Sequence, residues 1–173
     1  LTFTDAADGA SAPNYTLTAA LGTADTSGQA WEVGLSADGN TAFVADGGSG
    51  LQIIDVSNPS APIVTGTLDS LGFAWGVALS DDGDTAYVAA DTNGLKIIDV
   101  SNPSAPILKG TLDTNGVASD VTLSSDGDTA YVADFTSGLQ VIDISNPSAP
   151  ALTGTLATSG QALDVTLSAN RNT

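Results

Sequence analysis

The chain has 173 residues, of which three are basic and twenty are acidic, and its formal net charge is −17. With so few basic residues the chain lacks the clustered Lys and Arg that bind phosphates, so we expect neither nucleic-acid binding nor attraction to anionic membranes. Cysteine and histidine are absent, which excludes disulfides, thiolate or imidazole metal sites and a Ser-His nucleophile. No run of 18 apolar residues occurs, so we expect no membrane insertion.

The sequence repeats itself with a fixed period. The string Ser-Asn-Pro-Ser-Ala-Pro occurs three times, at 57–62, 101–106 and 145–150, and the pair Gly-Thr recurs at the same intervals. A constant period of roughly 40–50 residues is typical of stacked arrays and propellers. The pattern predicts a partial blade at each end and three full repeats between them. The boundaries are 1–21, 22–65, 66–109, 110–153 and 154–173.

The predicted elements are short strands, and we expect no helix because no segment has helical periodicity. Residues 1–5 and 15–21 are predicted to be the third and fourth strands of an incomplete blade. The second repeat shows four runs rich in Val, Ile, Leu, Tyr and Thr, each bounded by Gly, Asn, Asp or Pro. These four predicted strands are 74–79, 85–89, 95–100 and 107–112. Residues 162–167 are predicted to be a first strand that no second strand follows.

Turn chemistry supports this strand assignment. The Asp-Gly pairs that begin at Asp38, Asp82 and Asp126 supply the positive φ that a tight hairpin needs. Prolines cluster after each third strand, where a turn must stand because proline cannot donate to a ladder. Three aspartates end the third strands, and we expect their side chains to accept backbone N–H bonds within that turn. They are Asp55, Asp99 and Asp143.

The segments 50–62, 94–106 and 138–150 resemble the LVIVD repeat, which is named for its third-strand motif. The hairpin Ser-x-Asp-Gly-x-Thr-Ala-Tyr-Val-Ala also resembles the YVTN and related repeats of bacterial propellers. The resemblance implies a β-propeller, found mostly in secreted or surface proteins of bacteria and archaea, with no common catalytic residues. We therefore expect an all-β, propeller-type array of four-stranded antiparallel blades that is part of a larger ring. The alternative is an open array closed by other copies.

An acidic ring is predicted at one end of the blades, where two sets of loops emerge together. The predicted ring contains Asp25, Asp69 and Asp113 after the fourth strands, and Asp46, Asp91 and Asp134 between the second and third strands. Aspartate is common in turns, and turn chemistry alone can explain these residues. Calcium is the alternative, because it takes six to eight hard oxygen ligands. These six residues are therefore the predicted metal ligands, and calcium is the one cofactor we consider.

The first strand of each unit has one position that differs between units, occupied by Glu32, Gly76, Asp120 and Asp164. Carboxylates on an innermost strand could line a channel, or they could reach water at the strand end, since unpaired buried charge is costly. Trp31 and Trp75 occupy the preceding position. We expect them to fill the core between blades, which is the more common role of tryptophan.

These patterns favour a non-catalytic module for protein interaction, adhesion or structural assembly, located outside the cell or on the surface of a bacterium or archaeon. A calcium-dependent ligand-binding propeller and an Asp-based hydrolase are the alternatives. Strand edges left open at both ends are expected to seek further blades of the same polypeptide, protein partners, or copies that build a filament-like homopolymer.

Overall fold

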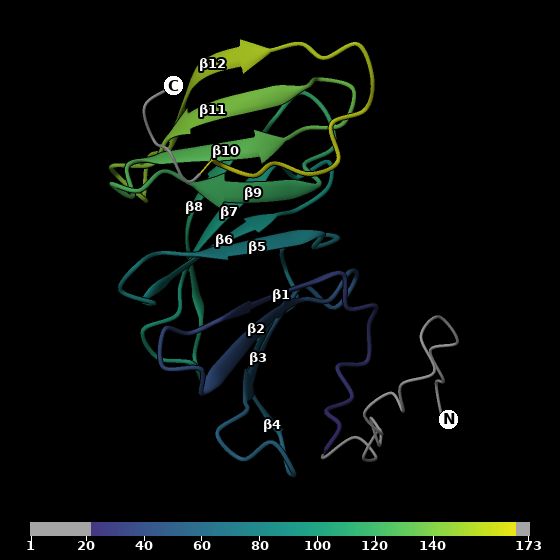
Figure 1. The fold of residues 1–173 in the computed structure, drawn as a ribbon, viewed down its shortest axis with the longest axis vertical. Coiled ribbons are helices and arrows are strands. Elements are labelled where there is room, and N and C mark those ends of the chain that lie inside the picture. The colour runs from purple at the N-terminus through teal and green to yellow at the C-terminus, as the bar shows by residue number, and fades with distance from the viewer. Residues whose placement is uncertain (1–21, 169–173) are drawn as a thin grey trace, which may run out of the picture.

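The computed structural model describes residues 22–168 and folds them into twelve strands without a helix (Figure 1). The strands form three antiparallel four-stranded sheets, β1–β4, β5–β8 and β9–β12, and in each sheet the strands are neighbours in chain order. In the first sheet they are β1 (Glu32–Leu35), β2 (Thr41–Ala45), β3 (Leu51–Asp55) and β4 (Ile63–Leu68). In the second they are β5 (Gly76–Leu79), β6 (Thr85–Ala89), β7 (Leu95–Asp99) and β8 (Ile107–Leu112). In the third they are β9 (Asp120–Leu123), β10 (Thr129–Ala133), β11 (Leu139–Asp143) and β12 (Ala151–Leu156).

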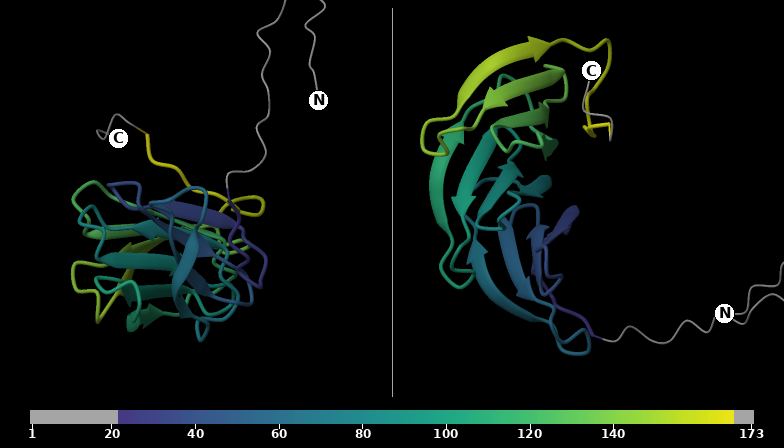
Figure 2. Two further views of the ribbon diagram at one scale, coloured as in Figure 1. Left: turned by 90° about the horizontal axis from the view of Figure 1, so that it is seen from below. Right: turned by 60° about the vertical axis from the view of Figure 1, so that its left-hand side comes forward.

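The sheets are the blades of a propeller-type array and follow one another along an arc (Figure 2). The first strands lie on the concave side, and β5 contacts both β1 and β9. The fourth strands lie on the convex side. The predicted blade fold is thus confirmed, whereas the strands predicted within 1–21 lie outside the described residues. No described segment is a helix with the length and apolar character needed to cross a membrane.

The hairpin between the first and second strand of each sheet is built by an aspartate. In the first sheet Asp38 Oδ1 accepts hydrogen bonds from Ser36 Oγ at 2.6 Å and from the Asn40 N–H at 3.0 Å. Gly39 follows with a φ of +70°, a conformation that favours glycine. Asp82 and Asp126 repeat these bonds. The expected hairpin role of these aspartates is therefore confirmed.

The proline-rich turn after the third strand also follows the prediction. Asp55 accepts the Ser57 N–H at 2.9 Å, and the corresponding aspartates of the other two sheets accept the same bond. The turn packs against the preceding sheet, where Gly66 faces Pro103 so closely that a Cβ on Gly66 would overlap the Pro103 carbonyl oxygen. The glycine of the recurring Gly-Thr pair is thus a contact point between neighbouring blades.

The hydrophobic core lies between the sheets. Because successive side chains of a strand point to opposite faces, the second sheet contributes to two cores. Ile98 packs with Phe43 toward the first sheet, and Ile97 packs with Ile142 toward the third. All four side chains are at most 2% exposed. Each blade interface is therefore a separate core that needs both of its blades.

The predicted strand 162–167 is not formed. Ala162 makes one isolated bridge to Phe135, and the residues that follow are not in a strand. The physical reason is that a first strand gains its ladder from the second strand of its own sheet, and no second strand pairs with this segment within residues 22–168. The segment instead lies beside β9, where the Val165 N–H donates to Asp120 Oδ2 at 2.8 Å.

Candidate functional site

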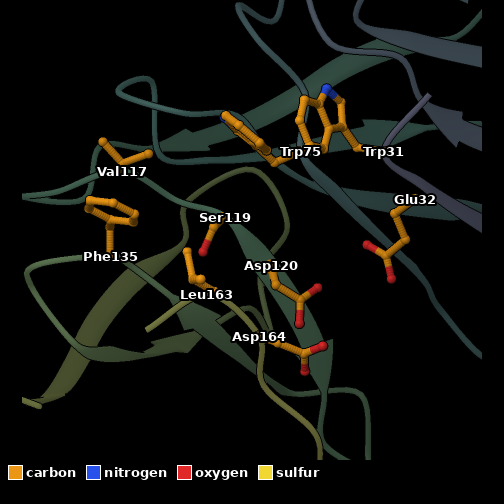
Figure 3. Close-up of a pocket in the computed structure, with 9 residues that line it drawn as sticks. All are labelled: Trp31, Glu32, Trp75, Val117, Ser119, Asp120, Phe135, Leu163 and Asp164. Atoms are coloured by element: carbon orange, nitrogen blue, oxygen red, sulfur yellow. The ribbon is translucent and has the colours of Figure 1, made fainter. Parts of the chain in front are cut away.

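A cavity of about 350 Å³ lies beside the innermost strands of the three blades (Figure 3). Its lining comes from β1, from the segments that lead into β5 and β9, from β9 itself, from the loop after β10 and from the C-terminal segment. The lining residues are Trp31, Glu32, Trp75, Val117, Ser119, Asp120, Phe135, Leu163 and Asp164.

The cavity is lined at positions where the otherwise similar repeats differ. One first-strand position holds Trp31, Trp75, Ser119 and Leu163, and the next holds Glu32, Gly76, Asp120 and Asp164. A repeated scaffold needs the same residue at each structural position, whereas a binding site needs different residues at its several walls. The variation therefore singles out this cavity as the candidate functional site.

Two of the carboxylates are fixed by bonds that cross between units. Glu32 Oε2 accepts the Val77 N–H at 2.7 Å, and Asp120 Oδ2 accepts the Val165 N–H at 2.8 Å. At Gly76, the corresponding residue of the middle unit, a Cβ would lie 2.9 Å from the Asp120 Cα. Glycine thus leaves room for the neighbouring carboxylate. The carboxylates line the cavity, and Glu32 and Asp164 are also exposed, so they reach water as well; both expected placements apply here.

The electrostatics of the cavity are unfavourable for carboxylates. Burial raises the pKa of Glu32, the Val77 N–H lowers it in part, and the negative charges of Asp120 and Asp164 raise it further. Burial also raises the pKa of Asp120, against the bond from the Val165 N–H. Within residues 22–168 no Lys or Arg forms an ion pair with these carboxylates, whereas Lys109 pairs with Asp99 at 2.9 Å elsewhere. The cavity therefore has negative charge that no cation of residues 22–168 balances through an ion pair.

An aromatic group forms another wall. The Trp31 and Trp75 ring centroids lie 4.3 Å apart, and Phe73 packs against Trp75 at 4.9 Å. Trp31 is 50% exposed, so the expectation that both tryptophans fill the core is wrong for Trp31. The reason is that Trp31 precedes β1 of the first described blade, so only the second blade covers it. The buried Trp75 Nε1 has no hydrogen-bond partner within the described residues.

The structure does not gather the six predicted metal ligands into one site. Asp25, Asp69 and Asp113 are exposed, and in the described part of the chain no three acidic side chains are placed to hold a metal ion. Asp46 and Asp134 are fully buried. Binding of calcium by any of these aspartates stays a prediction.

Asp46 and Asp134 share a position in their repeats, and each accepts a threonine hydroxyl at 2.7–2.8 Å. Burial raises the pKa of Asp134, and the bond from Thr114 lowers it in part. Asp91 belongs to a different position, one residue later in the repeat, where its φ is +54°. It is partly buried and bridges Ala118 in the next unit. All three aspartates lie between the second and third strands, as expected, but Asp91 has a different place in its loop from the other two.

Sequence reasoning named the carboxylates and tryptophans of the cavity but missed its remaining walls. Val117, Ser119 and Phe135 carry no motif, and they join the cavity only because neighbouring blades meet there. A position-by-position comparison of the repeats was the available signal. Phe135 stands where the other units have Gly47 and Asp91, which is a large change in side-chain size.

Several solved structures share this fold. One is a functionally unknown protein from Desulfotomaculum acetoxidans, with a TM-score of 0.66 and 20% identity. A candidate 6-phosphogluconolactonase from Bacteroides fragilis has a TM-score of 0.61 and 15% identity. The β-propeller domain of Cps50 from Myceliophteria thermophila has a TM-score of 0.56 and 14% identity.

The similarity to these structures covers 75%, 76% and 69% of this chain, respectively, but only 43%, 40% and 41% of theirs. The chain thus spans about two fifths of the length of the structures it matches. At these identities the likeness shows the fold alone. No curated protein sequence matches the chain at a significant level.

The family is shown by a direct match of the repeats. The LVIVD repeat model matches residues 27–70, 71–114 and 115–158, and each matched segment contains one of the three sheets. Together with the propeller-type blades, these matches show that the chain belongs to the LVIVD-repeat family.

Proposed function

We propose that the chain is a non-catalytic binding module that contributes three blades to a larger β-propeller. The observation that carries this proposal is a division of the acidic side chains into two groups. Repeated aspartates such as Asp38 and Asp55 are hydrogen-bonded within their own turns. The carboxylates that differ between repeats lie at the cavity. A constant scaffold with one variable cavity is suited to holding a ligand or a partner.

The first blade supports the proposal of a larger ring. Val33 and Leu35 on β1 are each 59% exposed, whereas Val77 and Val121, which correspond to Val33 in the other blades, are 4% exposed. The open face thus carries side chains that a neighbouring blade buries elsewhere in this molecule. We favour further blades of a longer polypeptide as the cover. A second copy of the chain is the rival, and it would build a homopolymer, because an interface that does not close on itself extends.

We further propose that the module acts outside the cell or at the surface of a bacterium or archaeon, in adhesion or structural assembly. The support is the family resemblance, which implies such a location. The surplus of negative charge is consistent with this role, because self-repulsion keeps a repetitive array soluble.

One observation favours a hydrolase as a second candidate. Glu32 and Asp120 both have a raised pKa at a cavity, and two carboxylates suffice for glycoside hydrolysis. Binding accounts better for the site, because backbone N–H groups hold one oxygen of each carboxylate in place. An anionic phosphosugar, as the name of the lactonase neighbour suggests, would meet repulsion from the carboxylates. Glycosidase activity that is abolished by Asp120→Asn would favour the hydrolase.

The test of the module proposal is association of the 173-residue chain through the open face. We expect light scattering to show a mass that rises with protein concentration, and Val33→Asp to reduce this rise. Ile63→Asp is the matched control, because Ile63 is 61% exposed but lies on β4. A compact monomer at high concentration, or equal association of both variants, would contradict the proposal that the β1 face is built to be covered.

A further inference from the structure

The cavity has two unlike walls (Figure 3). One wall is apolar and carries the indoles of Trp31 and Trp75 together with Val117, Phe135 and Leu163. The other wall carries Glu32, Asp120 and Asp164. A ligand that satisfies both walls has a positively charged group for the acidic wall and an apolar stem for the other wall.

The acidic wall is preorganised. Its two bonds to backbone N–H groups fix Glu32 and Asp120 before any ligand arrives, which reduces the entropy that binding would otherwise cost. Asp164 lies on the C-terminal segment, where Thr166 Oγ1 donates a long hydrogen bond of 3.4 Å to its carboxylate. An arriving donor therefore meets three carboxylates, two of them held in position.

The apolar wall argues against a bare inorganic ion as the ligand. A hydrated metal ion would gain nothing from the two indoles, and these acidic side chains are not arranged to hold a metal. The face of an indole does attract an ammonium or guanidinium group, with a benefit of about 0.5–2 kcal/mol. Trp31 is half exposed beside the cavity, so its ring is accessible to a ligand.

We propose that the cavity binds an organic cation, namely an ammonium or guanidinium group on an aliphatic stem. The charged group lies among Glu32, Asp120 and Asp164, and the stem lies along Trp75 and Leu163. This inference rests on the proposed binding function and names its ligand class. A free diamine and the lysine side chain of a protein partner share this chemistry, and the experiment distinguishes them.

The chain provides its own probe for this test. Trp31 and Trp75 are its only two tryptophans, and both line the cavity, so intrinsic tryptophan fluorescence reports on occupancy. We expect 1,5-diaminopentane to produce a saturable change with a Kd on the order of 1 mM at 0.15 M salt. Pentan-1-ol, which has a similar stem and no charge, is expected to produce none. No saturable change with the diamine, or the same change with the alcohol, would overturn the proposal.

Variants separate this site from the general attraction of cations to an acidic protein. Asp164→Asn and Glu32→Gln each remove one charge from the cavity and are expected to raise the Kd about two- to fivefold. Asp69→Asn is the matched control, because Asp69 is exposed and does not line the cavity. An equal effect of all three variants would show nonspecific attraction and overturn the proposal. Circular dichroism melts verify that each variant is folded.

Two further titrations identify the source of the cation. Tighter binding of the diamine than of Nα-acetyl-lysine amide would indicate a free amine as the ligand, and the reverse order would indicate a lysine side chain. Either order supports the organic cation. Calcium that quenches the tryptophans while both amines fail would overturn it in favour of a metal. Failure of both amines in a chain that still associates through Val33 would refute this inference and leave the module proposal standing.

Discussion

The first and second blades have nearly the same sequence but differ sharply in burial. Val77 on β5 is 4% exposed, and its counterpart Val33 on β1 is 59% exposed. Leu79 packs against the core, whereas Leu35 is 59% exposed. The side chains and their local backbone are alike, so the difference comes from the neighbouring blade alone. Each blade of this chain thus supplies only half of each core, and its stability depends on what lies beside it.

The convex side shows the same dependence at the other end of the array. Gly66 and Gly110 are buried against the proline turn of the following blade, whereas no turn covers Gly154 within the described residues. Leu156 on β12 is likewise 63% exposed, and its counterpart Leu112 on β8 packs against the core. The middle blade is therefore the only one of the three described blades with both neighbours in place.

The largest effect on stability is expected when a charge is placed in the interface between two blades, and this effect tests the comparison most directly. We expect Val77→Asp to lower the free energy of unfolding by about 3–4 kcal/mol, because a carboxylate there would be buried without a partner. At a protein concentration where the chain is monomeric, Val33→Asp is expected to change it by less than about 0.5 kcal/mol, since the residue is exposed in the single chain. Urea unfolding measures both. Equal losses would show that the β1 face is already covered in solution.

A smaller effect is expected at the glycines of the convex side. A Cβ on Gly110 would overlap the carbonyl oxygen of Pro147, whereas a Cβ on Gly154 would lie 3.6 Å from Val141, an ordinary contact. Gly110→Ala is therefore expected to cost about 1–3 kcal/mol of stability. Gly154→Ala is expected to be neutral or to stabilise by up to about 1 kcal/mol, because alanine restricts the unfolded chain. Comparable thermal melts for the two variants would contradict a blade contact at Gly110.

Much of the blade could be predicted from the sequence, because its turns are determined locally. The Asp-Gly hairpins and the proline turns each need only a few neighbouring residues, and they bracket the strands. In the second unit the strands predicted at 85–89 and 107–112 match the structure, and that predicted at 74–79 begins two residues too early. The early start includes Trp75, which pairs with the end of β6 only through its N–H to Ala89.

The cavity could not be predicted in the same way, because its residues meet only across blades. Glu32 and Val77 lie 45 residues apart and bond to each other, and no local pattern indicates that contact. The exposure of Trp31 also depends on a neighbour rather than on its own sequence. What sequence can provide for such a site is the list of positions at which the repeats differ.

The flanking units differ from the middle unit in the pH dependence that they give to stability. Glu32 and Asp120 occupy one first-strand position in the flanking units, and the middle unit has Gly76 there. A raised pKa means that the folded state binds protons more readily than the unfolded chain does. The contribution of Glu32 and Asp120 to the stability of the fold therefore becomes more favourable as the pH falls from 7 toward 4.5, the ordinary pKa of glutamate. We expect a higher Tm at pH 5 than at pH 7.

The double variant Glu32→Gln, Asp120→Asn is expected to flatten this rise. Asp69→Asn with Asp113→Asn, which removes two exposed charges, is expected to keep most of it. At lower pH the trend reverses, because bonds from Ser101 and Lys109 lower the pKa of Asp99 to about 2. Stability from such aspartates is lost as the pH falls from 3.8 through that value. A Tm that falls steadily from pH 7 to 5 would contradict the assigned directions.

The smallest effect is expected from calcium at the acidic loops, where the middle unit again differs from its neighbours. Asp46 and Asp134 are buried in the flanking units, and Ala90 takes their place in the middle one. We expect the exposed aspartates of these loops to bind calcium only weakly, with a Kd of about 1 mM. Mass action at 1 mM calcium would then add about 0.4 kcal/mol, or roughly 1 °C in Tm for a domain of this size.

Identical melting in calcium and in chelator would leave turn chemistry as the whole reason for the acidity of this rim. A rise well above this, absent in an Asp69→Asn, Asp113→Asn variant, would show instead that the exposed loop aspartates form a real site.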